Sequence, residues 1–378
     1  YAIEEYEKVP LNDTNYGWAM YEKGLSYAAD SQWTEAEKAL RECLKMKFYD
    51  KQNVYSLLGS TLDDEGKMDE AIEIFQEGLK EFPNYYLLHY NYGITLNKKK
   101  DIAGAIREFQ TAIYLNPFHP GSHFQLGLLC YKYNQPVPCL FSFTMYLLLK
   151  PNSPLAVSIM LYMQDFAQLK DPQVKPDSGL EHFSLWQKGE NDFNKYNFLL
   201  HNGQAKSKSF KGQTKLTFDL AKQLDQIFQS LSYNPNDAGF WNKVYVPVYE
   251  KIQKSGGFAS MIYMCLSNLD QPDIQKYVKK HSKDFDNFGP QARQFIIDNS
   301  NHFPVNVNGT DVIMNRSYGQ KNFINVLTEK INYEKNIGYG KCYSFYSNSK
   351  IKAIGQFNSS GDKDGTWKYF DEFGVPSS

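Results

Sequence analysis

The sequence predicts a mainly α-helical chain that ends in a small antiparallel β-hairpin repeat region. Three observations support this prediction. One set of residues recurs every 34 positions in the N-terminal part, helical patterns without that period return further on, and alternating aromatic residues follow near the C-terminus. We expect an α-solenoid over residues 1–170, a middle helical domain over 171–303, and a linker plus β-hairpins over 304–378.

Composition limits the classes of function. The chain has 378 residues, which is room for two or three domains, and 42% are hydrophobic, too many for a disordered chain. Lys and Arg number 41 against 42 Asp and Glu, so the net charge is -1 and the basic excess typical of nucleic-acid binders is missing. No run of residues approaches the roughly 18–20 apolar residues of a transmembrane helix. We expect protein partners, no nucleic acid, no transmembrane segment, and membrane association only through a partner complex.

Internal repetition places the solenoid. One set of residues recurs at intervals of 34: Leu58-Gly59, Ala71, Phe75 and Pro83; Tyr92-Gly93, Ala105, Phe109 and Pro117; Leu126-Gly127, Cys139, Phe143 and Pro151. An earlier copy, one residue out of phase, contains Gly24, Tyr27, Ala36 and Leu40. Such a period predicts stacked helical pairs, with repeats at about 17–50, 52–85, 86–119 and 120–153 and a capping helix at 154–170.

The residue types fit this geometry. Gly and Ala let two helices approach closely, aromatic residues fill the space between them, and Pro ends the second helix. The fourth copy departs from the pattern, because Cys139 and Tyr146 stand where small residues are usual and Gln135-Pro136-Val137-Pro138 leads into its second helix. We therefore expect distorted packing in the fourth repeat.

The Gly, Ala, Phe and Pro positions together resemble the tetratricopeptide repeat (TPR) family over about residues 17–153. The resemblance implies a superhelical scaffold whose concave groove binds protein partners. The groove-lining positions that it implies are Tyr21, Ser56, Ser60, Asp63, Tyr90, Asn97, Phe124, Tyr131 and Lys132. Relatives that bind chaperone tails hold a carboxylate with Lys and Asn, whereas Tyr21 and Leu25 stand at the corresponding places here. In the alternative interpretation, these aromatic residues only pack against neighbouring helices.

The middle of the chain is helical without a recognisable repeat. Residues 171–190 contain two prolines and a Ser-Gly pair, which is typical of a linker, and the basic run 206–215 is interpreted as a solvated loop rather than a nucleic-acid contact. Helical patterns then follow at about 218–231, 241–252, 258–268, 271–282 and 289–300.

Alternating aromatic residues mark the C-terminal hairpins. Tyr343 and Phe345 match Lys368 and Phe370 at an offset of 25, which is an imperfect internal repeat. The phrase KDGTWKYFDEFG resembles MORN-type repeats over about residues 335–375, which implies stacked hairpins with aromatic ladders. Trp367, Tyr369, Phe370 and Phe373 offer more aromatic surface than so small a sheet can enclose. We expect this surface to dock on the middle helical domain or on a partner.

No catalytic signature is present in the sequence. A P-loop, HExxH, GxSxG and dinucleotide fingerprint are all missing, so we expect no enzyme, no catalytic residue, no cofactor and no metal. An enzyme or ligand-binding domain hidden in residues 171–340 is the alternative. Its potential acids and bases, which show no interpretable spacing, are Glu181, His182, Asp192, His201, Asp270 and His281.

Cysteine and histidine positions favour structural roles. The five cysteines lack a CxxC motif and are interpreted as free buried thiols, with a Cys130–Cys139 disulfide as the alternative. His89 and His123 stand 34 residues apart, and we expect them to hydrogen-bond between helices rather than hold a metal.

These features together predict a non-enzymatic scaffold that binds protein partners through the groove. The sequence as given starts at Tyr1, which a removed signal peptide would explain, as would trimming. The MORN resemblance also implies proteins that are often exported. We therefore expect the periplasm or cell surface of a bacterium, within an envelope complex, with the cytoplasm as the alternative.

Overall fold

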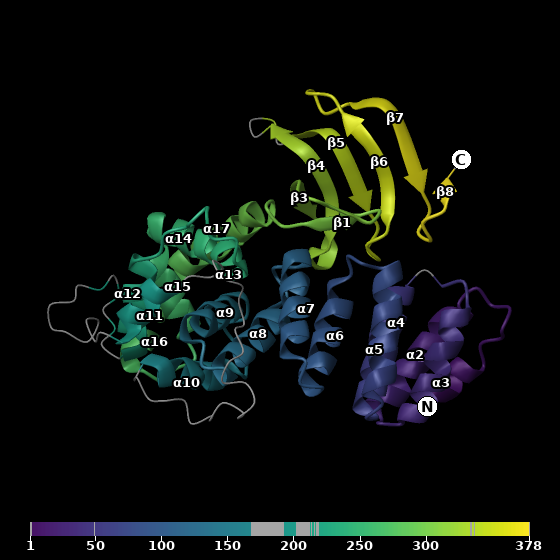
Figure 1. Cartoon of the computed structure of the whole chain (residues 1–378), viewed down its shortest axis with the longest axis horizontal. Helices are drawn as coiled ribbons and strands as arrows, with labels where there is room; N and C mark the ends of the chain where they lie inside the picture. The colour runs from purple at the N-terminus through teal and green to yellow at the C-terminus, as the bar shows by residue number, and fades with distance from the viewer. Residues whose placement is uncertain are drawn as a thin grey trace. The chain divides into compact units, whose positions relative to one another are not determined.

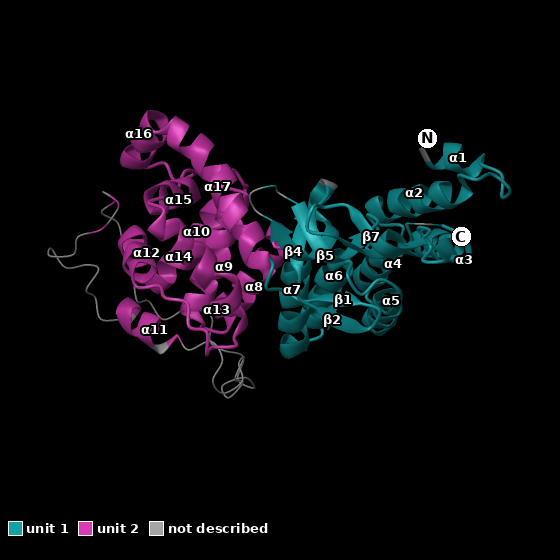
Figure 2. Ribbon diagram, turned by 90° about the horizontal axis from the view of Figure 1, so that it is seen from above, with its two compact units in different colours: residues 1–116, 301–378 teal, residues 117–300 magenta. Residues whose placement is uncertain are grey.

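The chain folds into two compact units in a computed structural model. The structure describes residues 2–48, 50–167, 193–201, 212, 214, 216, 219–332, 335 and 337–377. Unit 1 joins residues 1–116 to 301–378, and unit 2 comprises residues 117–300 (Figure 2). The contacts thus group the chain differently from the three expected segments. The C-terminal strands belong with the first repeats, and the fourth repeat belongs with the middle helices.

Unit 1 begins with three helical pairs that follow a short helix α1 (Ala2–Glu7) (Figure 1). The pairs are α2 (Tyr16–Ala29) with α3 (Trp33–Lys45), α4 (Lys51–Asp64) with α5 (Met68–Glu81), and α6 (Tyr86–Lys98) with α7 (Ile102–Leu115). They match the first three expected repeats, and this part of the predicted solenoid is confirmed.

The repeated glycines hold each pair together as expected. A Cβ added to Gly59 would lie 2.5 Å from the Phe75 ring, and one added to Gly93 would lie 2.7 Å from the Phe109 ring. Both rings are fully buried. Each phenylalanine therefore occupies the space that a side chain at the glycine would need.

The C-terminal part of unit 1 is an antiparallel sheet of six strands in sequential order. The strands are β3 (Asn315–Tyr318), β4 (Ile324–Asn332), β5 (Ile337–Phe345), β6 (Ile351–Phe357), β7 (Lys363–Phe370) and β8 (Pro376–Ser377). A separate hairpin, β1 (Val305–Val307) and β2 (Thr310–Val312), precedes them. The two valines of β1, Val305 and Val307, form one core with Leu327, Tyr343 and Phe345 of the sheet.

Strand structure begins earlier than expected. The sequence places hairpins from about residue 335 and a linker before them, whereas β1–β4 already occupy much of 305–332. The aromatic alternation that marks β5 and β7 is missing from β3 and β4. Their buried positions are held by Arg316, Leu327 and Thr328, which do not form an aromatic ladder.

Three turns at one end of the sheet share one geometry. Backbone N–H groups of Gly319, Tyr346 and Asp371 each donate to the carbonyl four residues ahead, at 2.8, 2.9 and 2.8 Å. The fourth residue of each turn has a positive φ, namely 63° at Asn322, 66° at Ser349 and 84° at Gly374. These are three-residue hairpin loops closed by a left-handed residue. The last two turns are 25 residues apart, which agrees with the repeat seen in the sequence.

Unit 2 is helical throughout its described part. Its helices are α8 (Pro120–Lys132), α9 (Pro136–Leu149), α10 (Ala156–Ala167), α11 (Asn194–His201), α12 (Asp219–Gln229), α13 (Phe240–Val244), α14 (Val246–Lys254), α15 (Phe258–Cys265), α16 (Pro272–Lys280) and α17 (Ser282–Ser300). Helix α17 starts seven residues before the expected position 289. The expected linker 171–190 lies outside the described residues, as does the basic run 206–215 apart from Gly212 and Thr214.

The fourth repeat is more regular than expected. Pro136 and Pro138 lie in the first turn of α9, where a missing backbone N–H removes no intrahelical hydrogen bond. A Cβ on Gly127 would lie 2.5 Å from the Phe143 ring, as in the earlier pairs. The expectation of distorted packing is therefore wrong for the pair α8–α9.

Candidate protein-interaction site

The predicted groove residues divide between the two units. Six lie on the first helices of the three pairs in unit 1, and three lie on α8 in unit 2. Tyr21, Ser56 and Tyr90 occupy equivalent positions on α2, α4 and α6, because the repeat brings the same helix face to the same side of each pair. They therefore form a row along successive helices of unit 1.

Each member of this row also contacts its neighbours. The half-buried Tyr21 ring lies 6.0 Å from Trp18 and 6.3 Å from Phe48, measured between ring centroids. Ser56 is buried, and its Oγ accepts a hydrogen bond of 2.8 Å from Asn91 Nδ2. The Tyr90 ring lies 6.0 Å from Phe109. The row is held in place by side-chain contacts, and its tyrosines keep part of their surface accessible.

A second row of polar residues lies one to two turns further along α4 and α6. Ser60 Oγ donates to the Ser56 carbonyl at 3.0 Å, and Asn97 is half-buried on α6. Asp63 is 7% exposed, and its Oδ2 lies 2.8 Å from the Lys98 ammonium. Its other oxygen, Oδ1, has no hydrogen-bond partner among the described residues. This row adds polar groups to the aromatic one.

The groove residues of unit 2 also contact aromatic neighbours. The Phe124 ring lies 5.5 Å from Tyr146, and Tyr131 lies 4.7 Å from Tyr162. Tyr131 Oη donates to Asp165 Oδ2 at 2.6 Å, and burial together with that carboxylate raises the pKa of Tyr131. Lys132 holds its ammonium 5.8 Å from the Tyr133 ring centroid. These contacts are compatible with the alternative interpretation, in which the aromatic residues pack against neighbouring helices, and partner binding at these positions stays a prediction.

The C-terminal sheet docks on the first repeats. The Phe323 ring stacks 6.0 Å from Tyr85, Lys350 forms an ion pair of 2.9 Å with Glu81, and the Lys47 ammonium lies 4.7 Å from the Phe373 ring. These contacts join the turns of the sheet to the loops between helical pairs. The sequence did not predict these contacts with the first repeats, and docking of the hairpin aromatics on a partner stays a prediction.

The four expected contact residues of the hairpins face two directions. Phe370 and Phe373 lie beside α5 and line a cleft there. Trp367 is half-buried across the sheet from Gly355, with Phe357 at 4.8 Å and Tyr369 at 6.2 Å. Trp367 thus packs on its own sheet, where glycine leaves room for the indole.

The two repeat histidines bridge helices as predicted. In both, Nε2 lies 3.0 Å from a proline carbonyl six residues earlier, Pro83 for His89 and Pro117 for His123. Nδ1 of His89 contacts Glu108 at 2.7 Å, and Nδ1 of His123 contacts the Tyr245 hydroxyl at 2.7 Å. No group of three or more His, Cys, Asp or Glu that could hold a metal occurs among the described residues.

The alternative catalytic residues do not converge where the structure describes them. Asp270 is exposed, and His281 pairs with Asp284 at 2.7 Å. Glu181, His182, Asp192 and the side chain of His201 lie outside the described residues.

The five cysteines are free and buried, which confirms the thiol interpretation over the disulfide. Burial raises the pKa of Cys43 to about 12 and that of Cys342 to about 11, so these thiols are poor nucleophiles.

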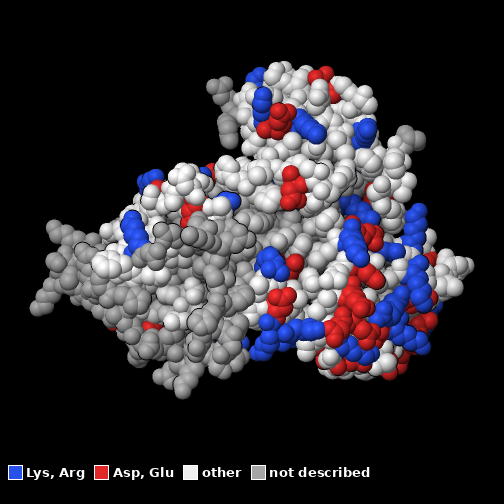
Figure 3. Space-filling model, viewed as in Figure 1, with Lys and Arg blue, Asp and Glu red and all other residues white. Residues whose placement is uncertain are grey.

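Charges of both signs mix on the helical surface that carries α3–α5 (Figure 3). Arg41 bridges Glu37 and Glu70 at 2.6 and 3.4 Å, and Lys67 pairs with Glu37 at 2.9 Å. A basic stripe of the kind that binds nucleic acid is missing from this face. No helix in the described part of the chain has the length and apolar character needed to span a bilayer.

Comparison with known proteins assigns the N-terminal repeats. Residues 21–86 and 57–123 match the sequence profile of the tetratricopeptide repeat. The three helical pairs α2–α3, α4–α5 and α6–α7 are TPR repeats. Proteins built on TPR repeats generally mediate protein–protein interactions and are typically non-enzymatic scaffolds. No curated protein matches the sequence.

Several solved structures share the helical repeats. YrrB, described as a TPR protein with an unusual peptide-binding site, is 17% identical, with a TM-score of 0.34 over 42% of this chain and 81% of YrrB. A mutant form of MamA is 19% identical, with a TM-score of 0.33 over 42% of this chain and 91% of MamA. PilF of Pseudomonas aeruginosa is 16% identical, with a TM-score of 0.37 over 74% of this chain and all of PilF. Scores this low establish no shared function.

The sequence did not identify several residues that hold the two parts of unit 1 together. Asn84, Phe323 and Arg316 join the sheet to the helices, yet none occupies a repeated position. The TPR pattern marks contacts between helices and carries no signal for the loops that receive the sheet.

Proposed function

We propose that this chain is a non-enzymatic scaffold that binds a protein partner along the first helices of its N-terminal repeats. The observation that carries the proposal is the row Tyr21, Ser56 and Tyr90, repeated on successive TPR pairs with accessible aromatic surface. Aromatic side chains supply large contact area at low entropic cost, and neighbouring Asn and Ser side chains can hydrogen-bond a peptide backbone.

The tyrosine row defines the expected partner segment. Tyr21 and Tyr90 keep part of their surface accessible, whereas Asp63 is buried and its Oδ2 lies 2.8 Å from the Lys98 ammonium. The supported partner is a peptide segment with apolar side chains for the tyrosine row.

Photo-crosslinking tests this assignment. A crosslinking amino acid is placed at Tyr90 in one variant and at the exposed Tyr233 of unit 2 in a control variant. After irradiation in the native source, we expect a defined adduct from position 90 that Tyr21→Ala reduces. Equal adducts from both positions, or no effect of Tyr21→Ala, would rule out the row as the binding surface.

We further propose that the partner complex belongs to a bacterial envelope and that β5–β8 are MORN-type hairpins. The supports are the KDGTWKYFDEFG phrase and the repeated turn geometry 25 residues apart. Intact-mass analysis of the native protein, set beside its gene-encoded N-terminus, tests export. A protein that retains its full encoded N-terminus would contradict cleavage of a signal peptide.

A further inference from the structure

The β1–β2 hairpin of unit 1 turns through an Asn–Gly pair. Val307 and Thr310 are partners on the two strands, so Asn308 and Gly309 form a two-residue loop between them. Their φ values are 51° and 80°, and two positive φ values are typical of a type I′ turn. Both residues are exposed, and the Asn308 amide has no hydrogen-bond partner among the described residues. This amide is therefore accessible to water.

An asparagine side chain cyclises most readily where glycine follows it. The backbone nitrogen of Gly309 attacks Cγ of Asn308, a C–N bond forms, and Nδ2 leaves as ammonia together with the proton of the Gly309 N–H. Water then opens the cyclic imide at one of its two carbonyls, which yields aspartate or isoaspartate at position 308. The attack needs space at the second residue, and a Cβ added to Gly309 would meet no atom within 4 Å.

Asn306 restrains the nitrogen that has to attack. The N–H of Gly309 donates to Asn306 Oδ1 at 3.0 Å, and Nδ2 of Asn306 donates in turn to Asp311 Oδ1 at 3.2 Å. While the first hydrogen bond is intact, the Gly309 nitrogen keeps its proton and stays directed at Asn306 instead of at Cγ of Asn308. The folded turn therefore slows a reaction that its sequence favours.

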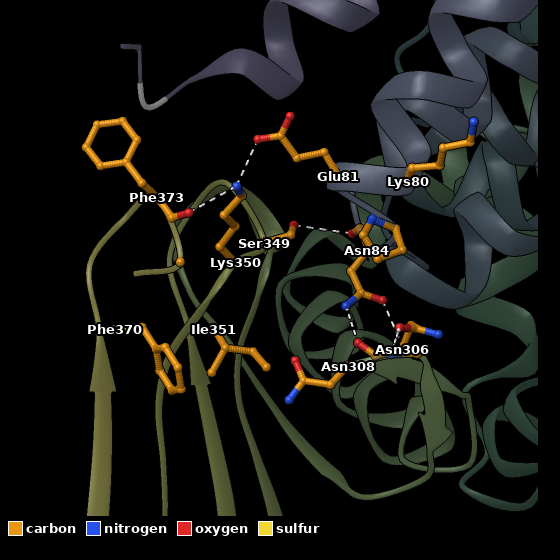
Figure 4. A pocket seen from close by; sticks show the side chains of 13 residues that line it. Lys80, Glu81, Asn84, Asn306, Asn308, Ser349, Lys350, Ile351, Phe370 and Phe373 are labelled. Atoms are coloured by element: carbon orange, nitrogen blue, oxygen red, sulfur yellow. Dashed lines mark hydrogen bonds and ion pairs between the residues drawn. The ribbon is translucent and has the colours of Figure 1, made fainter. Parts of the chain in front are cut away.

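The restraint is anchored on the helical part of unit 1. Asn84, in the loop between α5 and α6, accepts a hydrogen bond of 2.9 Å from the N–H of Asn306 and donates one of 2.5 Å to its carbonyl (Figure 4). Ser349 Oγ, from a turn of the sheet, donates to the Asn84 carbonyl at 3.3 Å. Asn84 and Asn306 are 222 residues apart in the chain, so this anchor exists only while the hairpin is docked on the helices.

We propose that Asn308–Gly309 is a site of spontaneous deamidation whose rate is set by docking of the β1–β2 hairpin on Asn84. While the hairpin is docked, Asn306 holds the Gly309 nitrogen and the reaction is slow. When the hairpin separates from Asn84, the nitrogen is released and Asn308 is converted. The site is separate from the proposed TPR row.

The isoaspartate product changes the backbone of the turn. In isoaspartate the main chain runs through Cγ, which inserts one additional atom into the two-residue loop. The adjoining Val307–Thr310 pair then loses its register, and Val305 and Val307 belong to the core that includes Leu327. We therefore expect isoaspartate to loosen this core, so that one separation of the hairpin favours the next.

Peptide mapping by mass spectrometry measures the conversion at position 308 during incubation of the full chain in a mildly alkaline buffer. The chain in denaturant gives the rate of the unrestrained sequence, and we expect the folded chain to react more slowly. Asn306→Ala removes the acceptor and Asn84→Ala removes the anchor. Each should raise the rate of the folded chain by about threefold to tenfold, the ratio that corresponds to one hydrogen bond.

A matched control separates this restraint from the general loss of an asparagine. Asn358 accepts hydrogen bonds from two backbone N–H groups at the turn between β6 and β7, and Asn358→Ala should leave the rate at position 308 unchanged. Equal rates in the folded and the denatured chain, or unchanged rates in both Asn306→Ala and Asn84→Ala, would overturn the proposal.

Hydrogen exchange tests the consequence of the modification. The isoaspartate form, separated by chromatography, should lose protection in β1 and β4. Asn308→Asp adds the same charge without the additional backbone atom and should keep that protection. An isoaspartate form that is as well protected as Asn308→Asp would contradict the loosening of the core.

Discussion

Arg316 shows how one residue joins two kinds of secondary structure. It lies on β3, is 5% exposed, and donates through Nη1 to the Tyr114 carbonyl at 2.5 Å. Tyr114 belongs to the last turn of α7, where carbonyls lack helical partners and carry partial negative charge. Nη2 donates to Phe303 and Pro304. Burial lowers the pKa of Arg316, and these carbonyls compensate the guanidinium in place of a carboxylate.

Replacing this guanidinium should loosen the sheet from the helices. Arg316→Met leaves three carbonyls without donors, so we expect unit 1 to lose about 2–4 kcal/mol of unfolding free energy. Hydrogen exchange read by mass spectrometry on peptides from α7 and β3 would show the loss. Arg107→Met, at an exposed position of α7, is the control and should have little effect. Unchanged protection of β3 in Arg316→Met would refute this role.

His123 on α8 and His119, the residue just before that helix, should affect the stability of unit 2 when they titrate. His123 is enclosed between the Pro117 carbonyl and the Tyr245 hydroxyl, and His119 contacts Ser122 at 2.8 Å. Burial lowers the pKa of each to about 4, from about 6.5. The Pro117 carbonyl can only accept a hydrogen bond, so in neutral His123 Nε2–H donates to it and Nδ1 accepts a hydrogen bond from the Tyr245 hydroxyl.

The sign of the pH dependence follows from these pKa values. Between pH 4 and 6.5 the unfolded chain binds more protons than the folded unit, so stability rises with pH across this window and is fully present above it. A single fully buried histidine contributes up to about 3 kcal/mol. Exchange protection of α8 and α9 should therefore fall from pH 6.5 to 4, and His123→Gln should flatten that fall. A profile equally steep in the variant would contradict the assignment.

Helices and strands differ in how well the sequence predicts them. Gly59 with Phe75 and Gly93 with Phe109 make the same contact in successive repeats, so period and composition together predict the helical pairs. The same holds for Tyr346 and Asp371, which start equivalent turns 25 residues apart. Strands β3 and β4 lack such repetition. Their burial depends on Val305, Val307 and the loops of the solenoid, which are distant in sequence.

The candidate sites also differ in how well the sequence predicts them. Tyr21 and Tyr90 could be named from the repeat, because a position on a TPR helix determines its face. The cleft beside α5 that Phe370 and Phe373 line could not be predicted, since it exists only after the sheet docks on α5. Docking depends on single contacts such as Phe323 with Tyr85, which follow no period.

The two compact units do not follow the order of the residues along the chain. Unit 1 is made of two segments that are separated by all of unit 2 in the sequence. Turns of the sheet contact the solenoid at two places. Phe373 lies at Lys47, between α3 and α4. Lys350 pairs with Glu81 at the end of α5, and Phe323 stacks on Tyr85 just before α6. The sheet therefore connects the helical pairs of unit 1 to one another.

This arrangement predicts that residues 2–116 and 301–377 unfold together, apart from unit 2. Phe323→Ala removes a ring stacked on Tyr85 and should cost about 1–3 kcal/mol, lowering exchange protection in both α4–α6 and β3–β6. Helices α12–α15 should keep their protection. Phe198→Ala removes an exposed phenylalanine of unit 2 as the matched control and should change neither unit.

A variant in unit 2 provides the reciprocal test of separate unfolding. Trp241 is fully buried in unit 2 and donates from Nε1 to the Pro138 carbonyl at 3.2 Å. Trp241→Phe loses this hydrogen bond and leaves a space, so protection should fall in α9 and α13–α15 and persist in the strands. If Phe323→Ala loosened the helices of unit 2, or Trp241→Phe loosened the sheet, the chain would unfold as one body. Opposite, separate losses would show that the C-terminal strands derive their stability from the N-terminal repeats.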